Sequence, residues 1–374
     1  MLRLNTSIMW DANVFRVPDS APDPQLARGI PGKSDRITTT TVGLLIDKAY
    51  AQQRFQLDVS QTAIRNANFT FLNHDPFQYH GAWLWSLSPR ISGTLSADHA
   101  ESLIPFTDLT SPERNVRVTD TRTFNLDGWM FGGWHVLVGA VNTESKNSEV
   151  FLAEPSYNTN AGEVGLKYVA ESGNSIAATT RSTRGNNPAQ GPDPVNLIDN
   201  EFSVRESELK TAWMISGKST LNGRLARLDR HNEHLPQRDF SGTTGELSYI
   251  WAVDGRLLLN FSASRNILPW TADTQASYRI DDRFSFTPSL RISERITVRM
   301  LAYRLVNDFR GPVAPLTGPS RRDTLRSAQL AVDWSPPMRN LRLTGSVQRD
   351  RRSSNAAGLD FDDTIAMLSA WLTF

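Results

Sequence analysis

The chain has 374 residues, enough for one large domain or for two to three ordinary ones. Its 40 Lys and Arg residues against 39 Asp and Glu residues leave a net charge of +1, which gives no reason to expect a nucleic-acid partner. No segment approaches the roughly 18 uncharged apolar residues of a membrane-spanning helix, and the absence of Cys excludes disulfides, thiolate metal sites and Cys nucleophiles.

Hydrophobic residues account for only 39% of the chain, although it contains 10 Trp and 17 Phe. This combination predicts apolar side chains at alternate positions instead of continuous runs. In 257–264, for example, the odd positions are apolar and the even positions after Leu258 are polar. A strand with one wet face has this pattern.

Taken in chain order, the same alternation predicts eighteen strands. Short connections, such as Gln52-Gln53 and Gly132-Gly133, take turns with long polar ones, such as 17–35 and 184–201. Outer-membrane barrels have short periplasmic turns and longer extracellular loops, so the alternation indicates a barrel with two unlike rims. The predicted strands lie near 2–15, 36–49, 54–66, 77–88, 90–99, 116–131, 134–143, 161–171, 174–183, 202–216, 220–230, 243–253, 256–265, 277–293, 295–308, 323–334, 340–350 and 360–374.

We therefore expect an all-β protein, a transmembrane antiparallel up-and-down β-barrel of about eighteen strands that forms one domain over residues 1–374. An unpaired N–H or C=O group costs several kcal/mol in hydrocarbon, so the strands have to close. A barrel of this size leaves room for an aqueous lumen. The alternative is a large soluble β-protein, such as a β-helix or two sandwiches, but no fixed-period repeat supports it.

The end of the last strand and the positions of the Trp residues favour a location in the bacterial outer membrane. The last strand ends on Phe374, with Leu372 and Ala370 on the same apolar face, and this pattern is typical of the signal that the barrel-assembly machinery recognises. The start at Met1 does not resemble a signal peptide, and we expect that one has been removed. Indole rings settle at membrane interfaces. A membrane girdle is therefore predicted from the Trp residues near short turns: Trp83, Trp85, Trp134, Trp213, Trp251 and Trp334.

The polar face of each strand is expected to point into the lumen, because Arg or Lys at the middle of the lipid face costs about 2–4 kcal/mol. Basic residues concentrate in the C-terminal third and several acidic residues in the first third, which predicts a transverse field. The plain interpretation is a hydrated wall, and the functional one is a path tuned for a polar solute. The lumen-lining candidates are Asp47, Asp58, Asp98, Asp127, Lys167, Glu206, Glu208, Lys210, Arg224, Arg256, Arg291, Arg295, Arg299, Asp333 and Arg342.

The sequence predicts no catalytic, metal or cofactor site. His231 and His234 suggest a metal pair, but no further ligands lie nearby in the sequence. Asp98 and His99 are the nearest catalytic candidates, yet adjacent residues of a strand face opposite sides. The segments 184–194 and 310–319 contain several Pro and Gly residues, and they either fold inward as constrictions or cover the barrel from outside.

The first predicted strand carries Asp11, Asn13, Phe15 and Arg16 in the run Trp10-Asp11-Ala12-Asn13-Val14-Phe15-Arg16-Val17-Pro18. This opening resembles the EpsL-like family, outer-membrane barrels encoded with exosortase-associated exopolysaccharide biosynthesis systems of Gram-negative bacteria. The resemblance is confined to this short run. It implies a role in exopolysaccharide export, and it implies no settled binding residues.

From the resemblance we expect a passive outer-membrane channel that exports a secreted polysaccharide. The chain has no ATP-binding motif, so the polymer would be delivered by a periplasmic polysaccharide export protein and an inner-membrane copolymerase. Outer-membrane lipid would surround the barrel. The alternatives are a general diffusion porin for small polar solutes, a rim enzyme acting on lipid or polysaccharide, and a structural anchor without flux.

Overall fold

The computed structural model describes residues 1–107, 112–151, 154–188, 191–192, 199–313, 319–338 and 340–374. Its helices are three 3-10 turns, η1 (Leu26–Arg28), η2 (Thr70–Leu72) and η3 (Pro236–Arg238). Its eighteen strands are β1 (Leu2–Asp11), β2 (Asp35–Tyr50), β3 (Gln53–Asn66), β4 (Phe77–Ser88), β5 (Ile91–Leu103), β6 (Val116–Phe131), β7 (Trp134–Asn147), β8 (Tyr157–Val169), β9 (Ser175–Asn186), β10 (Glu201–Ser216), β11 (Ser219–Asn232), β12 (Phe240–Ala252), β13 (Leu257–Pro269), β14 (Tyr278–Arg291), β15 (Ile296–Arg310), β16 (Arg322–Trp334), β17 (Leu341–Ser354) and β18 (Phe361–Thr373).

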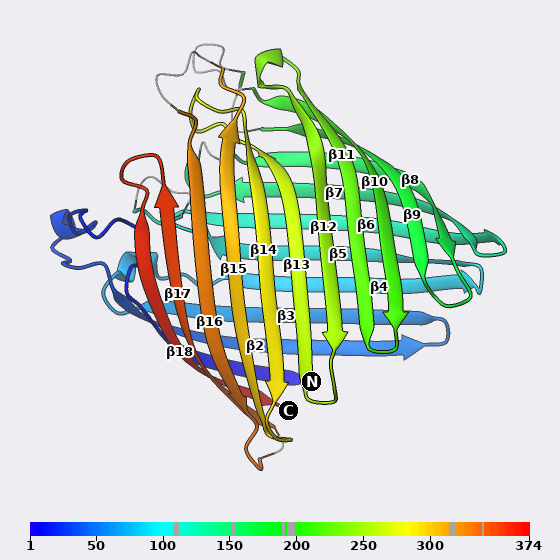
Figure 1. Cartoon of the computed structure of the whole chain (residues 1–374), viewed down its shortest axis with the longest axis horizontal. Helices are drawn as coiled ribbons and strands as arrows, with labels where there is room; N and C mark the ends of the chain where they lie inside the picture. Colours follow the sequence, from blue (N-terminus) through cyan, green and yellow to red (C-terminus); the bar gives the residue numbers. More distant parts are fainter. Residues whose placement is uncertain (108–111, 152–153, 189–190, 193–198, 314–318, 339) are drawn as a thin grey trace.

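Every strand pairs antiparallel with its neighbours in sequence, and β1 also pairs with β18, so the sheet closes into a barrel. The strands β11–β17 at the front cross β2–β7 behind them, as expected when tilted strands are seen from the side of a barrel (Figure 1). The predicted fold class is therefore confirmed. In the part of the chain that is described, no helix is long and apolar enough to cross a membrane.

The connections separate into a short-turn end and a long-loop end. Both chain termini lie at the short-turn end, where the amide of Leu2 donates to the carbonyl of Phe374 at 3.0 Å. The N-terminal amine of Met1 donates to the carbonyl of Leu45 at 2.9 Å. The long-loop end carries η1, η2 and η3.

Several strands extend further toward the long-loop end than the hydrophobic alternation predicts. The alternation predicts a strand over 134–143, whereas β7 continues to Asn147 through the polar residues 143–147. A backbone ladder needs no apolar side chains, so pairing continues where the apolar face has ended. The alternation therefore marks the part of each strand with an apolar face, and that part is shorter than the strand.

Strand β1 shows the opposite difference, because it ends at Asp11 and not near residue 15. The carboxylate of Asp11 accepts the amide of Asn13 at 2.9 Å and two N–H groups of Arg16, each at 2.9 Å. These bonds turn the chain away from the sheet. Arg16 has a φ of 57°, in the left-handed region that few residues other than Gly adopt.

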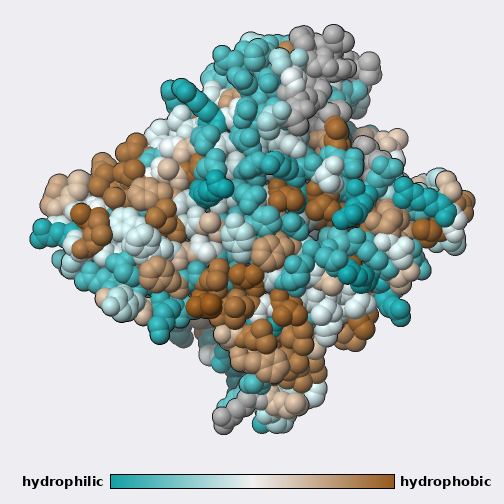
Figure 2. All heavy atoms as spheres, turned by 180° about the vertical axis from the view of Figure 1, so that it is seen from behind, coloured by the Kyte–Doolittle hydropathy of each residue, from teal (hydrophilic) through white to brown (hydrophobic). Residues whose placement is uncertain are grey.

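The two faces of the barrel wall differ in polarity, since successive residues of a strand point to opposite sides. On one face, Phe124 of β6 lies opposite Leu95 of β5 and Ala140 of β7. The other face is charged and points inward, because from it Arg352 of β17 donates to the carbonyl of Thr107 in the loop after β5, at 2.8 Å. From behind, hydrophobic residues gather mainly toward the left and lower edges, and hydrophilic residues cover most of the upper part (Figure 2).

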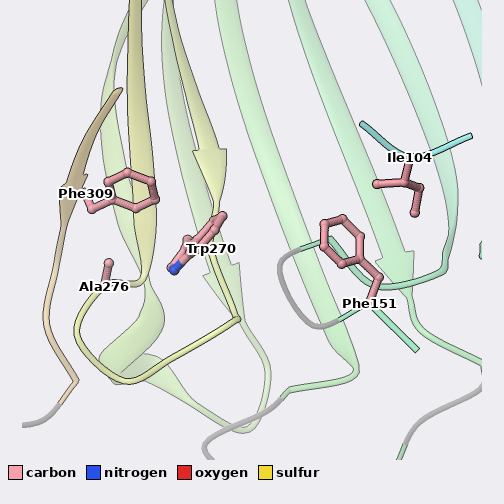
Figure 3. Close-up of a cluster of buried hydrophobic side chains, with 5 residues drawn as sticks. All are labelled: Ile104, Phe151, Trp270, Ala276 and Phe309. Carbon is pink, nitrogen blue, oxygen red and sulfur yellow. The ribbon is translucent and has the colours of Figure 1, made fainter. Parts of the chain in front are cut away.

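Two buried apolar clusters lie at the long-loop end. The first joins the loop after β1 to the loops after β3 and β5, and it contains Val14, Phe15, Phe69, Leu72 and Phe106. The second joins the loops after β5 and β7 to the far wall near β13–β15, and it contains Ile104, Phe151, Trp270, Ala276 and Phe309 (Figure 3). Trp270 and Phe309 pack edge to face with their ring centroids 4.8 Å apart. Because each cluster unites separate parts of the ring of strands, the long loops narrow this end of the barrel.

Candidate functional site

The structure places most of the predicted lumen-lining residues at inward positions of the strands. Three differ: Arg256 and Arg295 lie in short turns, and Arg291 is the last residue of β14. In the turn that contains Arg256, the carboxylate of Asp254 accepts the backbone amides of Arg256 and Leu257 at 2.7 Å each. Strand β13 therefore begins only after Arg256. The residues at inward positions are Asp47, Asp58, Asp98, Asp127, Lys167, Glu206, Glu208, Lys210, Arg224, Arg299, Asp333 and Arg342.

One inward group spans β9–β12 around Glu208. Its carboxylate accepts the Nε of Arg224 at 2.7 Å and the hydroxyl of Thr179 at 2.9 Å, and it pairs with Lys210. Arg224 also pairs with Glu206. Glu208 is only 7% exposed, so several donors replace the water that its carboxylate has lost.

A second inward group spans β15–β17 around Asp333. Arg299 donates to both oxygens of this carboxylate, at 2.6 and 2.9 Å. Arg342 and Thr344 donate to Oδ1 at 2.8 and 2.7 Å. Asp333 is 6% exposed, whereas both guanidinium groups reach into the lumen. Two positive charges therefore share one buried carboxylate on this wall.

The acidic residues of the first third have basic partners that the sequence analysis missed. Asp58 pairs with Arg3, Asp47 with Arg54 at 2.6 Å, and Asp98 with His80 at 2.5 Å. Asp127 pairs with the predicted Lys167 and also with His135, at 2.6 Å. Glu163 and Arg181 form a further inward pair across β8 and β9. The separation of signs across the lumen is therefore smaller than the sequence predicted, because each wall mixes acids and bases.

Odd or even position along the strand indicates that these partners face the lumen, whereas the acid that each of them binds depends on the register between strands. Arg54, His80 and His135 occupy inward positions directly across or diagonal to the acids that they bind. Arg3 also points inward, but from β1 it reaches across β2 to Asp58 of β3. Cross-strand neighbours of opposite charge are the expected arrangement on a sheet face.

A cavity of about 400 Å³ lies beneath the long loops, on the inner side of β7–β14. Aromatic rings and arginines line it together: the guanidinium of Arg230 stacks over the ring of Phe202, with its carbon 3.7 Å from the ring centroid. Arg238 donates to the carbonyls of Trp270 and Ala276 at 3.0 and 3.1 Å. The other residues that line the cavity include Phe151, Glu154, Tyr157, Asn187, Asp199, Asn232 and Arg279. This upper cavity offers both apolar surface and positive charge to a small molecule.

A loop carboxylate holds the rim of the upper cavity together. Burial raises the pKa of Asp199, but hydrogen bonds from the His234 ring at 2.9 Å and from three backbone amides outweigh burial and lower it below its usual value. The same hydrogen bond raises the pKa of His234. Asp199 and His234 therefore tie the loop after β9 to the loop after β11.

The residues of the opening run build the loop that follows β1. Arg16 binds Asp11 through two N–H groups and lies 3.0 Å from the carboxylate of Asp363 on β18. The side-chain amide of Asn13 donates to the carbonyl of Val17 at 2.7 Å. The ring of Phe15 packs in the first cluster, with its centroid 4.7 Å from that of Phe69 and 4.8 Å from that of Phe106. All four residues of the run thus fix a loop against the barrel.

Five of the six histidines bind carboxylates, and the ring of His74 bonds to the carbonyl of Leu72 at 2.8 Å. His231 contacts Asp239 at 3.0 Å, and His234 contacts Asp199. Asp98 points inward to His80, whereas His99 points outward to Asp120 at 2.8 Å, so this candidate catalytic pair is not brought together. Among the described residues, no group of three or more His, Asp or Glu side chains is placed to hold a metal ion.

The predicted girdle residues lie at outward positions near the short-turn end: Trp83, Trp85, Trp134, Trp213, Trp251 and Trp334. Most of them are exposed, but Trp85 is 8% exposed and stacks against Phe124 at 6.3 Å between ring centroids. Phe374 follows β18 and bonds through its backbone to Leu2. The centres of the two Pro- and Gly-containing segments, at 189–190, 193–198 and 314–318, lie outside the described residues.

No family model matches the chain, and no curated protein matches it. Solved structures share its fold. A BenF-like porin from Pseudomonas fluorescens Pf-5 has a TM-score of 0.54 and 12% identity over 100% of this chain and 98% of its own. OccK9 (OpdG) from Pseudomonas aeruginosa has a TM-score of 0.53 and 12% identity over 99% and 97%. OccK2 (OpdF) from the same organism, in complex with glucuronate, has a TM-score of 0.52 and 10% identity over 99% and 97%.

These findings correct the functional predictions. Membership of the EpsL-like family is wrong, because no family model matches and the structures that share the fold include OccK proteins and a BenF-like porin. The prediction of exopolysaccharide export is wrong for the same reason. The predicted polysaccharide substrate, periplasmic export protein and inner-membrane copolymerase are wrong with it. The narrowed long-loop end supplies a physical reason, because a polymer needs a wide exit.

The outer-membrane location is supported by the closed barrel and by these neighbours. The protein is a bacterial outer-membrane β-barrel with the fold of porins, which are channels and not enzymes.

Proposed function

We propose that the protein is a passive channel for small polar solutes in the outer membrane. The observation that carries the proposal is the inward face, on which charged groups of both signs follow one another around the wall. Water and polar solutes are stabilised next to such a charged wall, whereas the apolar lipid-facing side does not stabilise them. This function was the alternative to polymer export in the sequence analysis.

The narrowing at the long-loop end favours small solutes over polymers. The second cluster brings Phe151 and Trp270 together from the loops after β7 and β13. The upper cavity next to it holds about 400 Å³, within the range of pockets that take single small molecules. A solute of this size passes along the wall without unfolding the loops.

The residues that line the upper cavity favour small anions that contain a ring as solutes. Arg230 lines it beside Phe202 and Trp270. Arg238 and Arg279 also line it, but they bind backbone carbonyls and Asp281, and the carboxylates of Glu154 and Asp199 lie in the same wall. A guanidinium fork pairs well with a carboxylate, and an aromatic face packs well against a sugar or benzene ring. One structure that shares the fold was solved with glucuronate, a ring-bearing carboxylate, which agrees with this choice.

Liposome swelling tests the proposal. The purified protein is reconstituted without partners, and the swelling rate is measured in glucuronate, in glucose and in a long neutral oligosaccharide. We expect fast swelling in both monomers, faster in glucuronate, and little in the oligosaccharide. No swelling in any monomer, or equal swelling in the oligosaccharide, contradicts the proposal. Arg230→Gln should reduce the preference for glucuronate, whereas the control Arg54→Gln, at an inward pair near the short turns, should leave more of it intact.

We also propose two roles in the membrane for residues near the short-turn end. The six outward Trp residues near the short turns are proposed to form an interfacial girdle, because indole prefers that environment. Phe374 is proposed to be read by the barrel-assembly machinery. A Phe374→Ser variant should accumulate less folded barrel in cells and should fold normally into vesicles after purification, and a defect in both settings would contradict the assembly role.

A further inference from the structure

Arginines gather on the outward face of three adjacent strands. Arg304 of β15 lies directly opposite Arg326 of β16, and Arg326 lies directly opposite Arg351 of β17. Arg349 occupies the next outward position of β17. We refer to Arg304, Arg326, Arg349 and Arg351 as the outer arginine cluster. All four side chains are exposed.

This arrangement is unfavourable for the protein alone. Like charges directly opposite each other on neighbouring strands destabilise a sheet. The nearby carboxylate is that of Asp362, which lies 3.7 Å from Arg349 and 4.0 Å from Arg351. In the part of the chain that the structure describes, Arg304 and Arg326 form no hydrogen bond or ion pair through their side chains. Four positive charges therefore face one negative charge.

Three other outward arginines at the same end have a carboxylate partner. Arg265 binds both oxygens of Asp282 at 2.6 and 2.8 Å, Arg310 binds Asp308 at 2.6 Å, and Arg227 lies 3.6 Å from Asp229. On the opposite side of the barrel, the outward positions of β5–β7 at this end carry the acidic residues Glu101, Asp120 and Glu144 beside His99, Arg122 and Lys146. The excess of positive charge is thus a property of β15–β17 and not of the whole rim.

The outer arginine cluster lies at the upper edge of the apolar surface. The outward positions nearer the short turns carry Leu330, Val347 and Leu368, which are 55%, 55% and 71% exposed. About eight residues of tilted strand separate the arginines from the short turns, which corresponds to about 20 Å along the barrel axis. Phe284, opposite Arg304, adds an exposed ring. An anionic headgroup held by the arginines would therefore have its acyl chains along this apolar strip.

We infer that the outer arginine cluster binds the phosphate groups of an outer-leaflet glycolipid, the lipid A part of lipopolysaccharide. The occupant follows from charge and position. Guanidinium groups match phosphate oxygens two at a time, and a row of them matches a headgroup that carries two phosphates. A ligand with both phosphates and acyl chains satisfies the arginines and the apolar strip together. The site is separate from the lumen, so it acts whether or not the proposed channel function holds.

Native mass spectrometry of the full chain in detergent tests the inference, with bisphosphorylated lipid A as the probe. We expect one tightly held lipid A, and binding at least tenfold weaker for lipid A from which both phosphates have been removed. The variant R304Q/R326Q/R351Q should lose at least tenfold in affinity. The matched control R227Q/R265Q/R310Q removes the same charge from arginines that already have carboxylates, and it should bind as the unchanged protein does.

Several outcomes overturn the inference: equal binding by the triple variant, equal loss in the control, or equal binding of the dephosphorylated lipid. Displacement of lipid A by millimolar inorganic phosphate also overturns it, because the site would then take a free anion. Folding is checked by the migration of the unboiled protein on gels. If the triple variant fails to fold, the single variant Arg326→Gln, at the centre of the row, should show a partial loss of affinity, and no loss rejects the inference.

Discussion

The inward and outward faces of β15–β17 use the same residue type in opposite ways. Inside, Arg299 and Arg342 converge on the buried carboxylate of Asp333. Outside, Arg304 and Arg326 face each other without a carboxylate. Odd or even position along one strand separates the two sets. The comparison teaches that, on these three strands, the inward arginines are balanced within the protein, whereas the outer arginine cluster carries an excess of positive charge that the protein does not balance.

The largest expected effect comes from placing a charge on the wrong face. Leu330→Arg puts a guanidinium at an outward position of β16 within the apolar surface, and it should lower the free energy of unfolding by about 2–4 kcal/mol in lipid vesicles. Its neighbour Gln329 points inward, so Gln329→Arg is the matched control and should cost little. Urea titration followed by Trp fluorescence measures both. Equal costs would contradict the assignment of faces.

Removing the inner carboxylate gives a smaller effect on stability and a clear effect on ion selectivity. Asp333→Asn leaves Arg299 and Arg342 without their shared partner and should cost about 1–3 kcal/mol. The freed positive charge should shift the reversal potential toward that of chloride in a planar bilayer. Asp254→Asn, in a short turn, is the control. A shift toward cations would contradict an inward position for Asp333.

Removing the central outer arginine should change the stability of the barrel, and the direction of the change should depend on whether lipid A is present. In detergent without lipid A, Arg326→Gln relieves two like-charge neighbours and should stabilise the barrel by about 0.2–1 kcal/mol. In vesicles that contain lipid A it should destabilise it. Arg227→Gln, which removes an arginine with a carboxylate nearby, should show no reversal. If Arg326→Gln changed the stability in the same direction in detergent and in the lipid A vesicles, the comparison between the two faces would be wrong.

The smallest effect concerns pH at the rim. Because the bond to Asp199 raises the pKa of His234, the tie between these loops is fully present below the usual His pKa of 6.5 and is lost as pH rises through the raised value. The lowered pKa of Asp199 keeps the tie at mildly acidic pH. Cleavage of the long loops by a pH-tolerant protease should therefore increase from pH 6 to pH 9. His234→Gln should remove this dependence, and its persistence in that variant would argue against the pair.

The sequence predicted those features that depend on strand alternation. It placed Asp333, Arg299 and Glu208 on the inward face, because one side of a membrane-spanning strand has to be apolar. It missed partners such as Arg3 and His80, because pairing depends on register between strands that parity alone does not give. It also missed the outer arginine cluster, which needs the registers of three strands at once.

The family resemblance misled for a related reason. Asp11, Asn13, Phe15 and Arg16 resemble the opening of an exporter family, but in the structure they build a turn and a packed loop. A short run with a local structural role recurs wherever that turn is useful, so it does not carry a function. The end of β1 at Asp11 was missed because the pattern continues through a segment that the Asp11–Arg16 bonds fold away from the sheet.

Cysteine accessibility tests most directly the central claim that the charged face lines a water-filled lumen. The chain has no Cys, so single Cys variants are read without background. Ser346 points inward and its neighbour Val347 points outward on β17. In a planar bilayer, a negatively charged thiol reagent should react with Ser346→Cys and change the current, and it should not affect Val347→Cys. An unchanged current for Ser346→Cys, or reaction only at Val347→Cys, would contradict the account.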